Sequence, residues 1–211
     1  MLVIYPAKYQ DDSGEEITTI ENDGKNLTTL IRGIRFEGRD FDGLEPQETP
    51  EIVQKAMFTL NSGELCNCIL EFEMPISIMM INEIVSGTLQ AHLKLGKPHT
   101  NGGIDKERLQ LRLIWADLTV SSQGNTGWFD DGLSELQSAM PQGYLLRCCH
   151  TCAFSKYSPL GYGLFGGLAC FRYNKQGVLA VKNKGDLFKI WNSMTEYVQE
   201  TYLCSEFQRL I

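Results

Sequence analysis

Four cysteines in the last third of the chain have the residue type and the spacing of a closed metal site. Cys149 and Cys152 form a C-x-x-C pair, Cys170 follows a Gly-Gly step, and Cys204 lies near the end of the sequence. Structural zinc is commonly held by four thiolates, two of which come from a C-x-x-C turn. We therefore predict a structural zinc ion bound by Cys149, Cys152, Cys170 and Cys204.

Two other interpretations of these cysteines stay open. A zinc ribbon usually provides a second C-x-x-C pair, whereas 33 residues separate Cys170 from Cys204. Both could therefore be small buried apolar side chains. Redox or catalytic use is disfavoured, because the C-x-x-C pair is followed by a loop and not by a helix. A nucleophilic thiol also needs a neighbouring base, and no local signature joins His92 or His99 to a cysteine.

The remaining cysteines are expected to pack in the core. Cys148 neighbours Cys149 on a predicted strand, so its side chain should point away from the metal site. Cys66 and Cys68 stand two apart and should face the same apolar surface as Leu70. The glycines of segment 161–167 resemble a dinucleotide-binding pattern in letters only, because the segment runs into a predicted strand and not a helix.

The elements that position these residues follow from hydrophobic periodicity. Apolar residues alternate with polar ones over 66–72, 89–95 and 109–115, and a turn at 61–63 precedes the first of these, which indicates antiparallel strands with one buried face. Helical spacing predicts a helix over 129–140 that ends before Pro141, and a final helix with an apolar stripe from Leu187 to Val198 that begins at Asp186. Segments 37–51 and 10–26 are expected to be exposed.

These elements predict an α+β fold. An antiparallel, β-rich portion spans 1–122 and packs against a cysteine-bearing αβ portion that spans 123–211, and the two can form a single domain. Such a chain of 211 residues is long enough to bury a substantial core.

Bulk composition excludes several function classes. The net charge of -7 repels phosphate backbones, so nucleic acid is not an expected partner. No apolar run approaches the roughly 20 residues of a membrane span, and the first residues lack the basic region of a secretory signal. Seven cysteines with a C-x-x-C pair suit a reducing compartment, which predicts a cytoplasmic location.

Four segments resemble an uncharacterised bacterial family of unknown function. They are Gly-Trp-Phe-Asp-Asp at 127–131, the C-x-x-C stretch at 149–159, Phe-Gly-Gly-Leu-Ala-Cys-Phe-Arg at 165–172 and Val-Gln-Glu-Thr-Tyr-Leu-Cys at 198–204. The resemblance covers about 120–207 best. It implies the same four cysteines and a bacterial cytosolic accessory protein, such as an immunity partner in a toxin system, and it implies no reaction.

The expected function is therefore binding or regulation of a protein partner. Asp11, Asp12, Glu15 and Glu16 are the candidate exposed residues for meeting a basic toxin, since complementary charge speeds encounter. The alternative is a thiol- or zinc-dependent enzyme, in which Cys204 stays unbound and leaves an open metal position. A zinc-stabilised nucleic-acid reader would need a basic, aromatic-lined face, which the charge pattern lacks.

Overall fold

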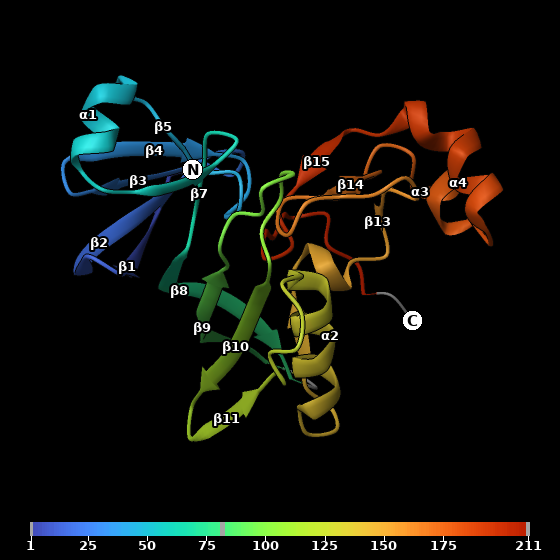
Figure 1. Cartoon of the computed structure of the whole chain (residues 1–211). Coiled ribbons are helices and arrows are strands. Elements are labelled where there is room, and N and C mark those ends of the chain that lie inside the picture. The colour runs from blue at the N-terminus through green and yellow to red at the C-terminus, as the bar shows by residue number, and fades with distance from the viewer. Residues whose placement is uncertain (1, 81–82, 210–211) are drawn as a thin grey trace.

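The computed structural model describes residues 2–80 and 83–209, and its fold is α+β (Figure 1). The main element is a ten-stranded antiparallel sheet with the order β11-β10-β9-β8-β1-β2-β3-β4-β5, in which β12 also pairs with β8. A three-stranded sheet, β13-β14-β15, and a short hairpin, β6-β7, complete the pairing. The strands are β1 Val3–Asp11, β2 Gly14–Asn22, β3 Leu27–Ile31, β4 Ile34–Gly38, β5 Glu45–Pro46, β6 Thr59–Asn61, β7 Glu64–Cys66, β8 Cys68–Met79, β9 Ile84–Leu95, β10 Glu107–Trp115, β11 Leu118–Ser121, β12 Leu145–Arg147, β13 Ser155–Tyr157, β14 Leu168–Cys170 and β15 Glu196–Val198.

The helices are short and lie mostly in the second half of the chain. They are α1 Pro50–Lys55, α2 Phe129–Ala139, α3 Lys175–Leu179 and α4 Lys184–Ile190, with 3-10 turns at Cys149–Thr151 and Trp191–Ser193. None of the helices in the described part of the chain is long and apolar enough to cross a membrane.

The long strands form where the sequence alternates. Every second residue of β8, from Cys68 to Ile78, is buried, and β9 and β10 continue the same pattern toward Leu95 and Trp115. One face of the sheet therefore packs in the core and the other meets solvent. The antiparallel pairing of β9 with β10, the turn at 61–63 and the helix that ends before Pro141 are confirmed.

The main core continues beyond the N-terminal half of the sequence. Phe129 and Leu133 of α2, Leu146 of β12 and Phe165 belong to the same buried cluster as the long strands. Helix α2 covers one side of β10 and β11, and its Gly132 sits where a Cβ atom would meet the Leu111 side chain. The sheet is therefore completed by segments on both sides of residue 122.

The prediction that segment 37–51 is an exposed loop was wrong. Phe41 and Leu44 are fully buried, and the segment contains β5 and the first two residues of α1. The Phe41 ring stacks on Phe72 at a centroid distance of 4.3 Å and lies 5.1 Å from Phe165. The aromatic anchor holds a segment whose Gly, Asp and Pro content alone is typical of a loop.

The predicted final helix was wrong in extent and in its N-cap. Helix α4 ends at Ile190, a 3-10 turn follows, and Tyr197 and Val198 belong to strand β15. The cap is Asn183, whose side chain accepts a hydrogen bond from the Asp186 backbone N–H at 3.1 Å. The apolar spacing was compatible with one helix, but residues 196–198 pair with β14, and this tertiary pairing overrides the local periodicity.

Candidate metal centre

The C-x-x-C pair lies where the chain leaves the large sheet. Strand β12 runs along β8, and a 3-10 turn at Cys149–Thr151 follows it directly. Cys148 is buried in the main core, whereas Cys149 belongs to a separate cluster with Leu168 and Cys170. The two neighbouring thiols therefore belong to different clusters, as predicted, but neither lies on a strand, because β12 ends at Arg147. In the turn, the Cys152 backbone N–H donates to the Cys149 carbonyl at 3.1 Å.

Strand β14 brings Cys170 beside this turn. Cys170 stands opposite Ser155 in the antiparallel pairing of β14 with β13. The Ser155 hydroxyl in turn donates to the Cys149 carbonyl at 2.5 Å, and its backbone N–H donates to the Cys152 carbonyl. Ser155 thus links the C-x-x-C turn to the strand that carries the third cysteine.

The C-terminal tail returns along the same turn and carries Cys204. The backbone N–H of Cys149 donates to the Tyr202 carbonyl at 2.7 Å, and that of Ala153 donates to the Gln208 carbonyl at 2.8 Å. Cys152 forms an isolated bridge with Arg209. Because these contacts flank Cys204 on both sides, the tail is fixed against the turn by its backbone. Three separate segments thus assemble around one place.

The thiols of this assembly are close enough to affect one another electrostatically. Burial raises the pKa of Cys149, and the nearby thiols of Cys152, Cys204 and Cys170 raise it further. Burial likewise raises the pKa of the Cys170 thiol, with smaller contributions from Cys204 and Cys152. Cys149, Cys152 and Cys170 are buried, and Cys204 is half-buried. Within residues 2–80 and 83–209, no three His, Cys, Asp or Glu side chains are arranged to hold a metal ion.

His150 makes its contact away from the thiols. Its Nε2 lies 3.2 Å from the Ser134 hydroxyl of α2, while its Nδ1 is buried and has no hydrogen-bond partner within the described chain. Burial lowers the pKa of the His150 imidazole, so the neutral form is favoured. The other two histidines singled out by the sequence are also remote from this turn. His92 lies on the solvent face of β9, and His99 lies in the loop between β9 and β10.

Two carboxylates, buried Glu200 and half-buried Asp40, clamp the glycine-rich segment that leads into β14. Glu200 is almost fully buried and accepts hydrogen bonds from the backbone N–H groups of Gly166 (2.6 Å) and Gly167 (3.3 Å). Asp40 accepts one from the Phe165 backbone N–H at 3.0 Å. Burial raises the pKa of Glu200 to about 7, and burial with the neighbouring Asp42 raises that of Asp40 to about 8.

Comparison with known families places the chain. A model described as "Family of unknown function (DUF6304)" matches residues 3–155. The chain belongs to this family. The matched range contains the large sheet, α2 and the C-x-x-C pair, while Cys170 and Cys204 lie outside it. Searches of the curated proteins and of the solved structures find no match.

The sequence had no signal for the carboxylate clamps. Asp40 lies in a Gly- and Asp-rich segment, and Glu200 follows a strand that was expected to be helix, so both looked solvent-exposed. Their role depends on segment 161–167, which comes near them only in the folded chain. The predicted exposure of Asp11 was also wrong, because its carboxylate forms an ion pair with Arg32 and only 6% of the side chain is accessible.

Proposed function

We propose that this protein is a binding protein whose cysteine-bearing portion is fixed by a structural zinc ion at Cys149, Cys152, Cys170 and Cys204. The observation that supports the site is the convergence of the C-x-x-C turn, β14 and the C-terminal tail, each held to the next by backbone hydrogen bonds. A cysteine side chain can reposition its sulfur by rotation about one bond, without moving the backbone. We infer that such rotations would bring the four sulfurs to a common ion while these hydrogen bonds persist.

Four-thiolate coordination also suits the electrostatics of the site. Each thiolate disfavours ionisation of its neighbours, and a divalent cation at the centre reverses that effect. Zinc binding would therefore release protons from the thiols and stabilise the fold at once. Buried thiols with raised pKa values are poor nucleophiles, which supports binding over thiol catalysis.

Metal analysis of purified protein tests the site. We expect about one zinc per chain in protein prepared under reducing conditions, and loss of that zinc in Cys170→Ser. Cys66→Ser is the matched control, because Cys66 is buried but lies on the β6-β7 hairpin, away from the turn. Wild-type protein that binds no zinc when refolded in its presence would contradict the proposal.

A zinc-dependent enzyme is the second candidate, and one observation favours it. Of the four cysteines, only Cys204 is half-buried, and a catalytic zinc keeps three protein ligands and an open position. Cys204→Ser separates the two candidates. A closed structural site should lose its metal and the order of the tail, whereas an open site with three thiolates should keep both.

For the partner, we propose a protein met in the bacterial cytoplasm, with an immunity-type role as one form of this function. The support is charge, because residues 1–51 carry twelve Asp or Glu against five Lys or Arg. Complementary charge raises the rate of encounter with a basic partner. If association with a cationic toxin from the same genomic neighbourhood is absent at low ionic strength, this form of the proposal fails.

A further inference from the structure

The solvent face of the large sheet is hollowed into a groove of about 980 Å³. Strands β1 and β2 form one wall, β8 and β9 form the floor, and β10 and β11 form the other wall. In Figure 1 the strands that line this groove are the blue β1 and β2 and the green β8, β9, β10 and β11. This face lies opposite the buried side of the sheet, and none of the four cysteines of the candidate metal centre lines the groove.

Cross-strand pairing orders the groove into rows. The first row crosses five strands through Ile17, Lys8, Glu71, His92 and Gln110. The second row lies two residues farther along the strands and crosses Glu73, Gln90, Arg112 and Ser121. Each row presents polar or charged side chains to solvent while the residues between them are buried.

The acidic side chains on the floor are already paired. The Glu71 carboxylate forms an ion pair with the Lys8 ammonium at 2.8 Å and lies 3.0 Å from His92 Nδ1. Glu73 accepts a hydrogen bond from the Gln90 amide at 2.8 Å. Both carboxylates are thus engaged by neighbours within the sheet, and Lys8 offsets the charge of Glu71, whereas the neutral Gln90 amide leaves that of Glu73 in place.

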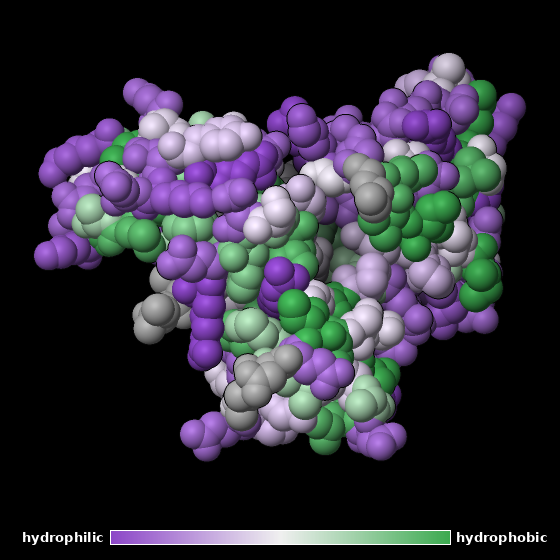
Figure 2. Space-filling view, turned by 180° about the vertical axis from the view of Figure 1, so that it is seen from behind, coloured by the Kyte–Doolittle hydropathy of each residue, from purple (hydrophilic) through white to green (hydrophobic). Residues whose placement is uncertain are grey.

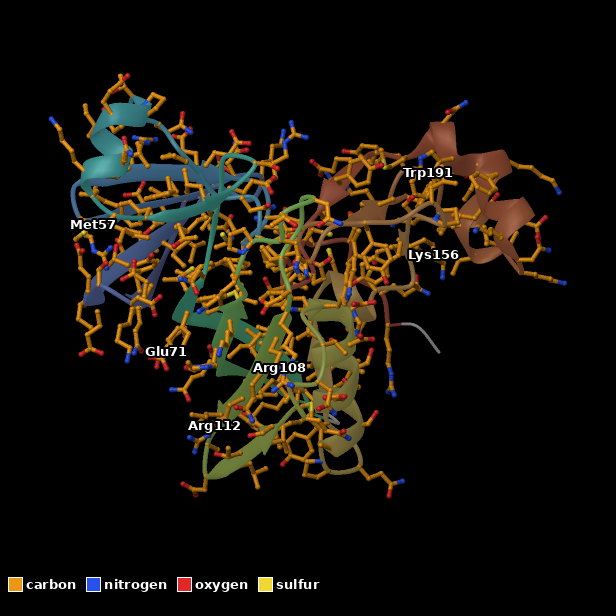
Figure 3. The ribbon with its side chains drawn as sticks, in the orientation of Figure 1. Met57, Glu71, Arg108, Arg112, Lys156 and Trp191 are labelled. Atoms are coloured by element: carbon orange, nitrogen blue, oxygen red, sulfur yellow. The ribbon has the colours of Figure 1, made fainter. Side chains whose placement is uncertain are left out.

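The cations that β9 and β10 present on the same face are not paired. Lys94 and Arg108 stand directly opposite each other on β9 and β10, beside the groove but not in its lining, whereas Arg112, farther along β10, lines the groove. None of the three makes an ion pair or a side-chain hydrogen bond with any residue that the structure describes. Like charges directly opposite on a strand pair are destabilising. Figure 3 shows Arg112 and Glu71 on the side of the sheet that faces the groove.

This cationic strip is a local exception in an acidic protein. Residues 84–115 carry five Lys or Arg against two Asp or Glu, whereas the whole chain has a net charge of -7. A bound anion would compensate the repulsion between Lys94 and Arg108. The charge of the strip therefore calls for a ligand with carboxylate or phosphate groups.

The opposite wall is apolar, which decides between these two kinds of ligand. Ile17 is 79% exposed and Ile4 is 56% exposed, and both line the groove together with Pro6. Figure 2 shows hydrophobic side chains grouped on the N-terminal half of the molecule among hydrophilic ones. A phosphate polymer has no aliphatic groups to cover this wall. A polypeptide can present apolar side chains and carboxylates on one strand.

We propose that the groove binds an extended, acidic segment of a partner protein. Its carboxylates meet Arg112 in the groove and Arg108 and Lys94 just beyond it, and its aliphatic side chains cover Ile17 and Ile4. Four strand spacings separate the two walls, or about 19 Å, which an extended chain of roughly six residues spans. The inference goes beyond the proposed function, because it gives a binding surface and the chemistry of its ligand without involving the metal site.

Binding of a capped octapeptide to the intact protein tests this inference. The peptide has three aliphatic residues at one end and three glutamates at the other, and its affinity is measured by titration calorimetry at two salt concentrations. We expect a Kd on the order of 10–100 μM that weakens with salt. Arg112→Glu should weaken binding about tenfold or more, and Ile17→Glu about fivefold.

The controls separate this surface from net charge and from the metal site. Lys184→Glu and Leu160→Glu make the same changes at exposed positions of the C-terminal portion, and they should leave the affinity unchanged. Cys170→Ser should also leave it unchanged, so failure of the zinc proposal stays distinguishable. No binding at 1 mM peptide, equal binding of a peptide with lysines in place of glutamates, or binding of polyphosphate but not of the peptide would each overturn the inference.

Discussion

The large sheet and the cysteine-bearing segment 148–209 differ in how they bury apolar surface. The sheet has one continuous core. It includes the buried faces of β8, β9 and β10, helix α2 and an aromatic cluster around Phe41. The cysteine-bearing segment has two separate clusters, of seven and four buried residues. Three of those eleven residues are Cys149, Cys152 and Cys170. Small cores of this kind are usually supported by an additional cross-link, and the proposed zinc ion would be such a cross-link.

Removal of the proposed zinc should unfold the cysteine-bearing segment while the large sheet stays folded. This is the largest effect that we expect. Structural zinc contributes on the order of 10 kcal/mol to folding in zinc-finger peptides. A chelator of zinc should therefore abolish amide hydrogen-exchange protection in β13, β14 and β15 while β8, β9 and β10 stay protected. Cys170→Ser should reproduce this pattern without a chelator. Unchanged protection in β14 under both conditions would mean that the small clusters are sufficient.

Loss of a ring from the aromatic cluster should instead destabilise both regions together. Phe41 contacts Phe72 of β8, Phe129 of α2 and Phe165, which directly precedes the Gly166–Gly167 step that leads into β14. Phe41→Ala removes a fully buried ring and should lower the free energy of unfolding by about 3–5 kcal/mol.

Denaturant unfolding followed by probes in each region measures this coupling. The control is Phe188→Ala, because Phe188 is 45% exposed on α4 and its loss should cost under about 1 kcal/mol. If Phe41→Ala destabilises β8 but leaves β14 at its original midpoint, the aromatic cluster does not join the two regions.

The same contrast explains which parts of the fold could be predicted from sequence. Strands β8, β9 and β10 have one buried face, so burial is written into the sequence as strict alternation. Residues 196–198 have no such pattern, because β15 is short and its place depends on pairing with β14. Phe41 escaped prediction for a related reason, since a single buried ring within a Gly-, Asp- and Pro-rich segment has no period.

The candidate site was predictable only in part. The C-x-x-C spacing indicates two ligands from local chemistry, but the approach of Cys170 and Cys204 depends on β14 and on the returning tail. The groove was not predicted, because its polar residues read as an ordinary solvent-facing side of each strand. The opposition of Lys94 and Arg108 requires the register of β9 with β10, which the sequence does not state.

Glu200 and Asp40 should make the contact between the two regions sensitive to pH. The pKa of Glu200 is about 7 in the fold against 4.5 ordinarily, so the folded state binds a proton that the unfolded chain releases. Its stabilising effect is complete below pH 4.5 and is lost as the pH rises to about 7. For this shift alone the loss amounts to about 3 kcal/mol. Asp40, with a pKa of about 8, should extend the decline in the same direction.

Glu200→Gln tests this contribution by denaturant unfolding at several pH values between 4 and 8. The amide oxygen can still accept the shorter of the two hydrogen bonds, from the Gly166 N–H, although the amide NH2 cannot accept that of Gly167. The side chain no longer ionises, so we expect a shallower decline with rising pH. Glu71→Gln is the control, since Lys8 lowers the pKa of that carboxyl and its removal cannot produce the same flattening. An unchanged slope in Glu200→Gln would show that Glu200 ionises normally.

The smallest effect is expected at the start of α4, the most peripheral helix of the cysteine-bearing segment. The Asn183 side chain accepts the Asp186 backbone N–H at 3.1 Å and donates to the Asp186 carboxylate at 2.9 Å. Asn183→Ala should lower the free energy of unfolding by about 1 kcal/mol, the usual value of an N-cap, and Asn192→Ala, at an exposed position, should have no effect. If the segment is held mainly by a central cross-link, this loss should appear as local fraying of α4 in hydrogen exchange, with β14 unaffected. If protection in β14 falls with that in α4, the segment depends on its helices as much as on its thiols.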